Sequence, residues 1–267
     1  MPVHDDLGLR IKNNYETIPK IRLVRRMPVV VRIDGKSFHS FTKGFKKPFD
    51  HVLIESMQQT MRYLCENIQG CVFGYTQSDE ISLLLIDYRE LNSQAFFDYE
   101  VQKICSITAS MATMEFNIRF RDNALTYVEN AIDSDDIADY KRCSDIYPNK
   151  FGSAMFDSRC FNIPKEEVTN YFYWRQLDAT RNSIQMVGQA NFSHKQLFGK
   201  SCNDIQDMLY EEKNINWNNL PIYLKRGSCC IKTKTIDNPP RSRWVIDEMI
   251  PIFKGDGREY IDKLVII

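Results

Sequence analysis

Runs of apolar residues predict four strands in the first 165 residues of the chain. The run from Pro28 to Ile33 contains three consecutive β-branched valines and is typical of a buried strand. Shorter runs predict strands at 71–76 and 81–86, which leaves the four residues Gln77 to Glu80 for a tight hairpin turn. A fourth strand is expected over 154–163, just before a proline.

Two stretches have helical spacing instead. Asp50 can cap a helix that Gly70 can end, and its apolar residues recur at steps of three and four: Leu53, Met57, Met61, Leu64 and Ile68. A longer helix is expected from about Ser93, because one face collects Phe97, Val101, Ile104, Cys105, Thr108, Met111 and Ala112. After residue 165 the pattern is mostly helical.

The order strand, helix, strand, strand, helix, strand is the split βαβ arrangement of ferredoxin-like domains. We therefore predict an α+β fold, with one domain over residues 1–165 and a mostly helical accessory part over 166–267. In this arrangement the first strand lies beside the hairpin. Asp34, which ends the first strand, is expected to face Asp79 and Glu80 in the turn.

Acids that converge at one edge of a sheet repel one another unless they share a cation. Oxygen ligands suit Mg²⁺, which uses few protein carboxylates and completes its shell with phosphates and water. Gly35 would let backbone and phosphate come close, and nearby cations could meet a triphosphate: Lys36, Lys43, Lys46 and Lys47. Two such ions would activate an attacking hydroxyl and stabilise a departing pyrophosphate. The alternative is that Asp34, Asp79 and Glu80 are ordinary turn residues.

Composition narrows the class of protein. The eight cysteines have no regular spacing and no CxxC pair, so we expect reduced thiols rather than disulfides or a structural zinc site. The formal net charge is zero, although basic residues cluster around 20–26 and 32–47. A charged N-terminus and the absence of an apolar run of membrane length predict a soluble, cytoplasmic protein.

Several motifs resemble the signature segments of one family. RIDGKSFHSF at 32–41, FKKPFD at 45–50 and GYTQSDEIS at 74–82 are similar to segments of the tRNA(His) guanylyltransferases, enzymes that add nucleotides in the 3′-to-5′ direction. Further similar segments follow the family order and lie at 6–16, 156–159, 174–178, 214–219 and 225–227. The resemblance therefore spans nearly the whole chain, and the ordered set is far more specific than any single motif.

The resemblance implies that residues 1–165 form a catalytic domain like a polymerase palm, with two Mg²⁺ ions and with ATP and GTP as substrates. It implies metal ligation by Asp34, Gly35 and Asp79, with Glu80 as a supporting catalytic acid. Residues expected beside the nucleotide are Lys36, Ser37, Phe38, His39, Lys47, Ser78 and Lys103. The substrate would be the 5′ end of tRNA, where a 5′-monophosphate is first adenylylated and a nucleotide 3′-hydroxyl then attacks. Members of the family form tetramers, so a homotetramer is expected.

One departure from the family pattern bears on the substrate. After the motif Trp-Arg-Gln-x-Asp, the eukaryotic tRNA(His) enzymes continue His-Ile-Asn-Asn-Leu-Tyr, whereas this chain has Thr-Arg-Asn-Ser-Ile-Gln at 180–185. The departure favours the guanylyltransferase-like branch, which repairs 5′-truncated tRNA by copying the opposite strand. The alternative is a tRNA(His) guanylyltransferase that adds G at position −1.

Backbone contacts suffice if the opposing RNA strand selects the nucleotide. We expect these contacts from Arg22, Arg25, Arg26, Arg175, Arg181 and Asn182, and from a loop over 232–243. The alternative for each is an ordinary surface or subunit-interface residue. Two other classes share the acid pattern: a nucleotidyl cyclase or conventional polymerase, and a non-catalytic RNA-binding module with a degenerate palm.

Overall fold

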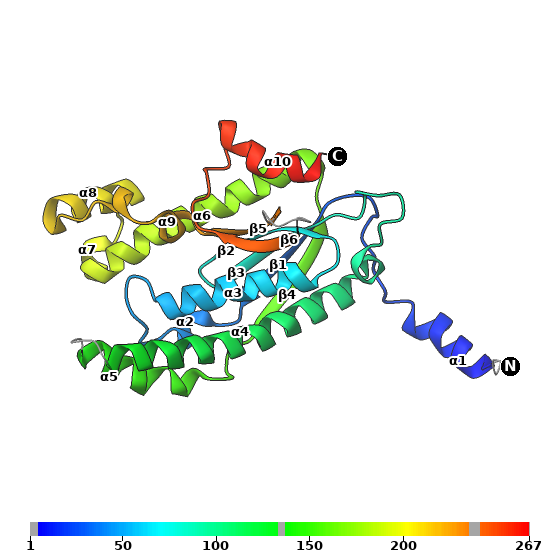
Figure 1. Ribbon diagram of the computed structural model, residues 1–267, viewed down its shortest axis with the longest axis horizontal. Helices are drawn as coiled ribbons and strands as arrows, with labels where there is room; N and C mark the ends of the chain where they lie inside the picture. The colour runs from blue at the N-terminus through cyan, green and yellow to red at the C-terminus, as the bar shows by residue number, and fades with distance from the viewer. Residues whose placement is uncertain (1–4, 133–136, 235–240, 267) are drawn as a thin grey trace.

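The computed structural model describes residues 5–132, 137–234 and 241–266. A six-stranded sheet lies at its centre, with the order β4-β1-β3-β2-β5-β6 and antiparallel pairing throughout (Figure 1). The strands are β1 (Val29–Gly35), β2 (Cys71–Gln77), β3 (Glu80–Leu85), β4 (Phe156–Asn162), β5 (Ser228–Lys234) and β6 (Ser242–Asp247). The first four have the strand order of the ferredoxin-like arrangement, so the predicted α+β fold is confirmed.

Helices cover both faces of this sheet. On one face lie α3 (His51–Asn67) and α4 (Val101–Ile132), and on the other lie α6 (Lys165–Asn191) and α10 (Glu259–Val265) (Figure 1). Alternate residues of β1 explain this double burial: Val29, Val31 and Ile33 pack towards α3 and α4, and Val30 packs towards α6. A smaller apolar cluster joins α6 to α8 (Cys202–Lys213).

The remaining elements are short. They are α1 (Asp6–Ile11), α2 (Phe38–Phe41), α5 (Ile137–Ile146), α7 (His194–Leu197) and α9 (Ile222–Arg226), with a π-helix at Lys12–Glu16 and 3-10 turns at Phe96–Tyr99, Pro148–Lys150, Trp217–Asn219 and Gly255–Arg258. Figure 1 shows α1 projecting away from the body of the molecule. In the described part of the chain, no helix has both the length and the apolarity needed to cross a membrane.

The predicted start of α3 agrees with the structure. The Oδ1 atom of Asp50 accepts a hydrogen bond from the backbone N–H of Leu53 at 3.0 Å, which is the predicted N-terminal cap. The helix ends at Asn67, and Gly70 lies beyond it with a positive φ of 79°. The side chains of Met57, Met61 and Leu64 are buried, as their spacing requires.

Three expectations need correction. The hairpin turn holds only Ser78 and Asp79, because Gln77 pairs with Glu80 and so places Glu80 in β3. The long helix begins at Val101 rather than near Ser93, since residues 97–99 all have positive φ and cannot continue a right-handed helix. The segment 232–243, expected as a loop, contributes its ends to β5 and β6, while 235–240 lie outside the described residues.

Candidate active site

Acids from three strands meet at one end of the sheet. Asp34 of β1 pairs with Glu80 of β3 on one side and with Asp157 of β4 on the other. The backbone N–H of Gly35 donates to the carbonyl oxygen of Asp79 at 3.0 Å. The structure therefore places the ends of β1 and of the β2–β3 hairpin side by side, with Asp34 and Asp79 on adjoining segments.

Asp79 is a mostly buried carboxyl group close to a second acid. Burial raises the pKa of its carboxyl group, and the nearby charge of Asp34 raises it further. The hydroxyl of Ser78 donates to Asp79 Oδ1 at 3.0 Å and opposes this shift. A cation bound between Asp34 and Asp79 would remove the cost of holding both groups ionised.

The backbone after Asp34 turns sharply and is held by the core. A Cβ atom on Gly35 would lie 2.3 Å from the Phe38 ring, so only glycine fits without movement of that ring. Ser37 follows with a positive φ of 56°, and the N–H of Lys36 donates to the carbonyl of Met155 at 2.8 Å. The turn thus presents exposed side chains at Lys36, Ser37 and His39 beside the acids.

Phe38 does not belong to this exposed group. Its side chain is only 4% exposed and packs against Phe41, Phe116 and Phe156 with ring centroids 4.9–5.5 Å away. The prediction of a nucleotide contact from Phe38 is therefore corrected: the ring anchors the turn, and only its backbone is available to a ligand.

Glu80 and Arg175 form a buried ion pair. Arg175 Nε and Nη2 each lie 2.7 Å from a Glu80 carboxylate oxygen, and Arg32 Nη2 lies 2.6 Å from Glu80 Oε2. Burial raises the pKa of Glu80, while the two guanidinium groups oppose that shift. Arg175 is 4% exposed, so its predicted contact with tRNA is wrong for this conformation, and Glu80 faces guanidinium groups rather than an open metal site.

A second group of predicted residues lies at the opposite end of β1. Lys103 is in the first turn of α4, and its Nζ atom lies 3.7 Å from Glu100 Oε2. Glu100 in turn forms a β-bridge with Arg22. Arg25 Nε lies 2.7 Å from Asp87 Oδ2. This end of β1 is about 17 Å from Asp34, at about 3.3 Å per residue. Within one chain, the structure therefore separates Lys103, predicted beside the nucleotide, and Arg22 and Arg25, predicted to contact tRNA, from Asp34 and Asp79.

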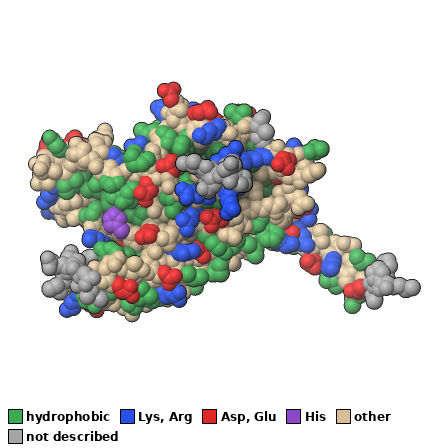
Figure 2. Space-filling view, in the orientation of Figure 1, with side chains coloured by type: hydrophobic (Ala, Val, Ile, Leu, Met, Phe, Trp, Pro, Cys, Tyr) green, Lys and Arg blue, Asp and Glu red, His purple; other side chains and the backbone are tan. Residues whose placement is uncertain are grey.

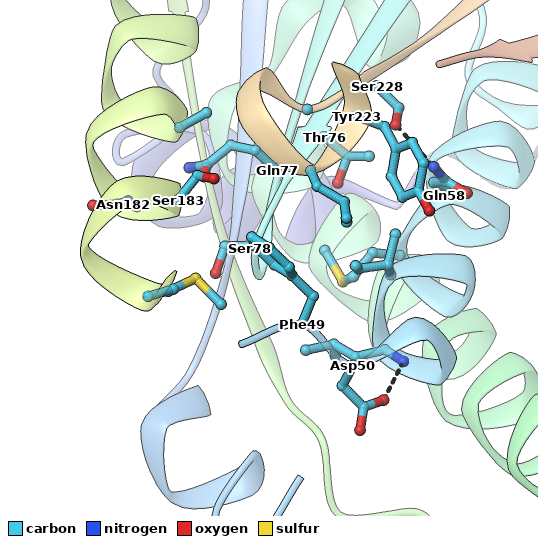
Figure 3. Close-up of a pocket in the computed structure, with 17 residues that line it drawn as sticks. Phe49, Asp50, Gln58, Thr76, Gln77, Ser78, Asn182, Ser183, Tyr223 and Ser228 are labelled. Carbon is cyan, nitrogen blue, oxygen red and sulfur yellow. Dashed lines mark hydrogen bonds between the residues drawn. The ribbon is translucent and has the colours of Figure 1, made fainter. Parts of the chain in front are cut away.

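A cleft opens beside the hairpin turn. Its lining includes Ser78 of the turn, Asp50 at the N-terminal cap of α3, Gln58 of α3, and Asn182 and Ser183 of α6, around a cavity of about 90 Å³. Figure 3 shows Ser78, Asn182 and Phe49 arranged around this cleft. Asn182 is thus a predicted tRNA residue that lines the same cleft as Ser78 of the hairpin turn, and Arg181 beside it is exposed and paired with Asp178.

Two residues near Asp34 were assigned no role from the sequence. They are Asp157 and Arg159, both in the edge strand β4. Arg159 Nη2 lies 2.9 Å from Asp157 Oδ1 and 3.9 Å from Asp34 Oδ2. The sequence feature that could have identified them is the alternation in Phe-Asp-Ser-Arg at 156–159. In a strand, this alternation places Asp157 and Arg159 on one face and Ser158 on the other.

The comparisons with known proteins fit this geometry. A family model described as tRNAHis guanylyltransferase matches residues 10–164, which is more than half of the chain. The chain belongs to this family. A probable tRNA(His) guanylyltransferase of Dictyostelium discoideum is 28% identical over 262 residues, with 91% of this chain and 92% of that protein covered. The tRNA(His) guanylyltransferase of Candida glabrata is 26% identical over 265 residues, with 91% and 99% covered.

Two solved structures match this chain over nearly its whole length. A bacterial tRNA(His) guanylyltransferase-like protein in complex with ATP superimposes with a TM-score of 0.81 at 45% identity, covering 97% of this chain and 99% of that one. A similar protein in complex with GTP gives 0.78 at 42% identity, covering 98% and 100%. This tRNAHis guanylyltransferase family member is therefore a nucleotidyltransferase with a palm-like fold.

The residues present suit the Mg²⁺ ions that the family implies. Asp34 and Asp79 would offer carboxylate oxygens and Gly35 a carbonyl at the end of β1, and all three are hard ligands. No group of three or more His, Cys, Asp and Glu side chains with metal-binding geometry occurs within the described ranges. A site with two side-chain carboxylates leaves most of each coordination shell to phosphate and water, which is the usual pattern for Mg²⁺ beside a nucleotide.

Proposed function

We propose that this member of the tRNAHis guanylyltransferase family adds nucleotides in the 3′-to-5′ direction to the 5′ end of tRNA. The observation that carries the proposal is the hydrogen bond between the N–H of Gly35 and the carbonyl of Asp79, because it fixes the end of β1, with Asp34, beside the hairpin turn that holds Asp79. The relatives that bind ATP and GTP support nucleoside triphosphates as substrates.

The roles of the side chains follow from their places. Asp34, Asp79 and the Gly35 carbonyl would hold Mg²⁺, which when bound supplies Lewis-acid stabilisation of phosphate charge. Lys36 and Lys47 are exposed near the same end of the sheet and can pair with a triphosphate. The hydroxyl of Ser78 could donate to it only after leaving Asp79 Oδ1. Glu80 takes a different role from the one first expected: it holds α6 against the hairpin through Arg175.

For the choice of substrate, we propose template-dependent repair of truncated tRNA. The segment 180–185, which departs from the eukaryotic tRNA(His) enzymes, lies on α6 where Asn182 and Ser183 line the cleft beside Ser78. If the opposing RNA strand selects each nucleotide, the protein needs contacts to backbone and phosphate rather than to one base. Arg181 is an exposed cation next to Asn182 and remains suited to such contacts, whereas Arg26, also exposed, lies with Arg25 at the opposite end of β1.

A second candidate is addition of one G at position −1 of tRNA(His). It is favoured by the named relatives, which are tRNA(His) guanylyltransferases. The two candidates share the carboxylate site and differ only in what directs the incoming nucleotide.

The deciding experiment offers 5′-monophosphorylated tRNA, shortened by one or two nucleotides, with Mg²⁺ and all four triphosphates, and sequences the products. Repair predicts added bases that complement the opposite strand, including when that strand is changed. Addition of G to intact and shortened tRNA, whatever base lies opposite, would establish the second candidate instead.

Controls separate the other classes. Asp79→Ala should abolish incorporation while tRNA binding persists, and Asp207→Ala, an exposed acid on α8, should change neither. Equal incorporation by Asp79→Ala and the native chain would refute the metal assignment, and binding without incorporation by the native chain would point to an RNA-binding module. A cyclic product formed without RNA would identify a nucleotidyl cyclase.

A further inference from the structure

An exposed tryptophan lies near the carboxylates. Trp174 of α6 is 52% exposed, although tryptophan is on average a largely buried side chain. Two neighbours hold its ring in place: the centroid of the Tyr171 ring lies 5.9 Å away, and the guanidinium carbon of Arg175 lies 4.5 Å from the centre of the indole. Trp174 therefore presents an aromatic surface that is both exposed and fixed.

Contacts between α6 and β3 set the level of Trp174 along the sheet. The hydroxyl of Tyr171 lies 2.8 Å from Ser82 Oγ, and Arg175 Nε lies 2.7 Å from Glu80 Oε1. Trp174 lies between Tyr171 and Arg175 in α6, so it stands at the level of residues 80–82 of β3. This is the end of the sheet where the acids meet.

Trp174 is on the side of α6 that faces the edge strand β4. Tyr171, three residues earlier, packs against Phe161 of β4 with ring centroids 5.7 Å apart. Phe161 and Arg159 are two residues apart in this strand, so they point to the same face of the sheet. The exposed indole of Trp174 and the 52% exposed side chain of Arg159 therefore border one surface, which is called here the β4 surface.

The acids lie between the β4 surface and the cleft. Asp34 pairs with Asp157 of β4, and Arg159 Nη2 lies 3.9 Å from Asp34 Oδ2. In the strand order β4-β1-β3-β2, the strand that ends in Asp34 and the hairpin that holds Asp79 follow β4. The cleft is lined from β2, the hairpin turn and α3, beyond these acids. Two separate surfaces thus adjoin the carboxylates.

We propose that Trp174 stacks on the terminal base pair of the acceptor helix of an RNA, and that Arg159 pairs with a phosphate beside that base pair. This inference rests on the proposed function, which brings an RNA end and a nucleotide to Asp34 and Asp79 at the same time. The cleft takes the nucleotide, so the β4 surface is left for the RNA. Arg159 uses one nitrogen for Asp157, and its remaining N–H groups can donate to a phosphate.

Stacking suits this chain for two reasons. Every base has a flat aromatic face, so a ring can hold the end of a helix without selecting its sequence, as template-directed addition requires. The formal net charge is zero, and Figure 2 shows basic and acidic side chains interspersed on the face that it draws. A chain with balanced charge gains little from general attraction to phosphates, and an uncharged stacking contact adds affinity that salt does not screen.

The first test measures the affinity for 5′-shortened tRNA, without nucleotide and at fixed salt, by filter binding. Trp174→Leu removes the ring and should raise the dissociation constant about tenfold, whereas Trp174→Phe keeps a smaller ring and should raise it less. The matched control is Phe198→Leu, because Phe198 is 79% exposed and follows α7, beyond the far end of α6. Figures 1 and 2 show this end of the molecule, where hydrophobic side chains are also exposed. The control should bind tRNA like the native chain.

A fluorescent base locates the contact. A 2-aminopurine in the terminal pair of the acceptor helix should lose fluorescence on binding to the native chain, because stacking on an aromatic ring quenches it. The loss should be much smaller with Trp174→Leu. The same base placed well inside the helix is the control and should give equal signals with both proteins. Equal quenching of the terminal base by the native chain and by Trp174→Leu would overturn the proposal.

The phosphate contact gives a second measurement, which holds even if Trp174→Leu does not fold. Arg159→Gln should reduce the slope of log K for tRNA against log salt by about one. The matched control is Arg121→Gln, because Arg121 is an exposed residue of α4 paired with Asp122, and its slope should equal that of the native chain. Equal slopes for Arg159→Gln and the native chain would overturn the phosphate contact. Circular dichroism checks the fold of each variant.

Other outcomes separate this inference from its alternatives. Weaker binding of ATP or GTP by Trp174→Leu, with unchanged affinity for tRNA, would assign the ring to the nucleotide and overturn the proposal. A changed sedimentation coefficient with unchanged affinity for tRNA would assign it to a protein contact, with the same consequence. If the native chain incorporates nucleotides and Trp174→Leu binds tRNA normally, this inference fails and the proposed function stands. If the ring binds tRNA but the native chain incorporates nothing, the proposed function fails instead.

Discussion

Replacement of Arg175 by alanine should destabilise the protein strongly, because it removes the main partner of a buried carboxylate. Arg175 and Glu80 are each 4% exposed and share two hydrogen bonds of 2.7 Å. Removal of one partner from such a pair usually costs about 3–5 kcal/mol, since the other charge stays buried. Arg32 still lies 2.6 Å from Glu80 and compensates part of the loss. We therefore expect a loss of about 3 kcal/mol, at the lower end of this range.

The free energy of unfolding, measured by urea titration at neutral pH, checks this value. Arg175→Lys should lose less, because it keeps the charge but cannot form both hydrogen bonds. The matched control is Arg181→Ala on the same helix, where an exposed pair with Asp178 should contribute less than about 1 kcal/mol.

The outcome decides between two roles for Arg175. If Arg175→Ala unfolds at the native urea concentration but binds tRNA more weakly, then the side chain leaves its buried pair to contact RNA. That result would refute the structural role argued here and restore the first prediction. Loss of stability with unchanged tRNA affinity of the folded fraction would support the buried pair.

Three further predictions concern the site itself. Gly35→Ala should lower kcat about 100-fold in steady-state assays, because the added Cβ would lie 2.3 Å from the Phe38 ring and displace the turn. The additional change Phe38→Leu makes room for this Cβ and should recover part of the lost kcat. In EDTA, Asp79→Asn should raise the Tm at neutral pH, because burial and the charge of Asp34 raise the pKa of Asp79 and its ionised form destabilises the fold. The gain in Tm should vanish as the pH falls below 3.8, the ordinary pKa of an aspartate, and a constant gain at all pH values would contradict this cause. Arg181→Ala should reduce the slope of log K for tRNA against log salt by about one, in filter-binding titrations, if it contacts a phosphate.

The fold of the first half could be predicted because its signals are local. Three consecutive β-branched residues favour the strand β1 in which they lie, and the cap at Asp50 favours the helix that begins at the next residue. The convergence of Asp34 on the hairpin followed from strand order alone, since neighbouring strands in this fold bring their ends together. The roles of these acids as metal ligands stay a prediction.

The remaining features depend on contacts that a pattern does not encode. Strands β5 and β6 are as long as the first four strands, but they extend a sheet that already exists and mix polar with apolar residues, so their own sequence carries little strand signal. Arg175 was expected at the RNA as one of several basic residues, and only the position of Glu80 across the sheet face explains its burial. Lys103 was placed at the triphosphate by resemblance alone, and the direction of α4 puts it at the other end of β1.

The position of α6 explains how the site can stay constant while the substrate varies. The helix crosses one face of the sheet, pairs with Glu80 through Arg175, and then passes the hairpin turn at Asn182. The buried pair fixes the helix beside Asp79, and the residues one or two turns later meet the cleft. Changes in 180–185 can therefore alter what the cleft accepts without moving Asp34 or Asp79. A transplant of His-Ile-Asn-Asn-Leu-Tyr into 180–185 should shift product sequences towards untemplated G while total incorporation is kept. If product sequences do not change, substrate choice is determined elsewhere.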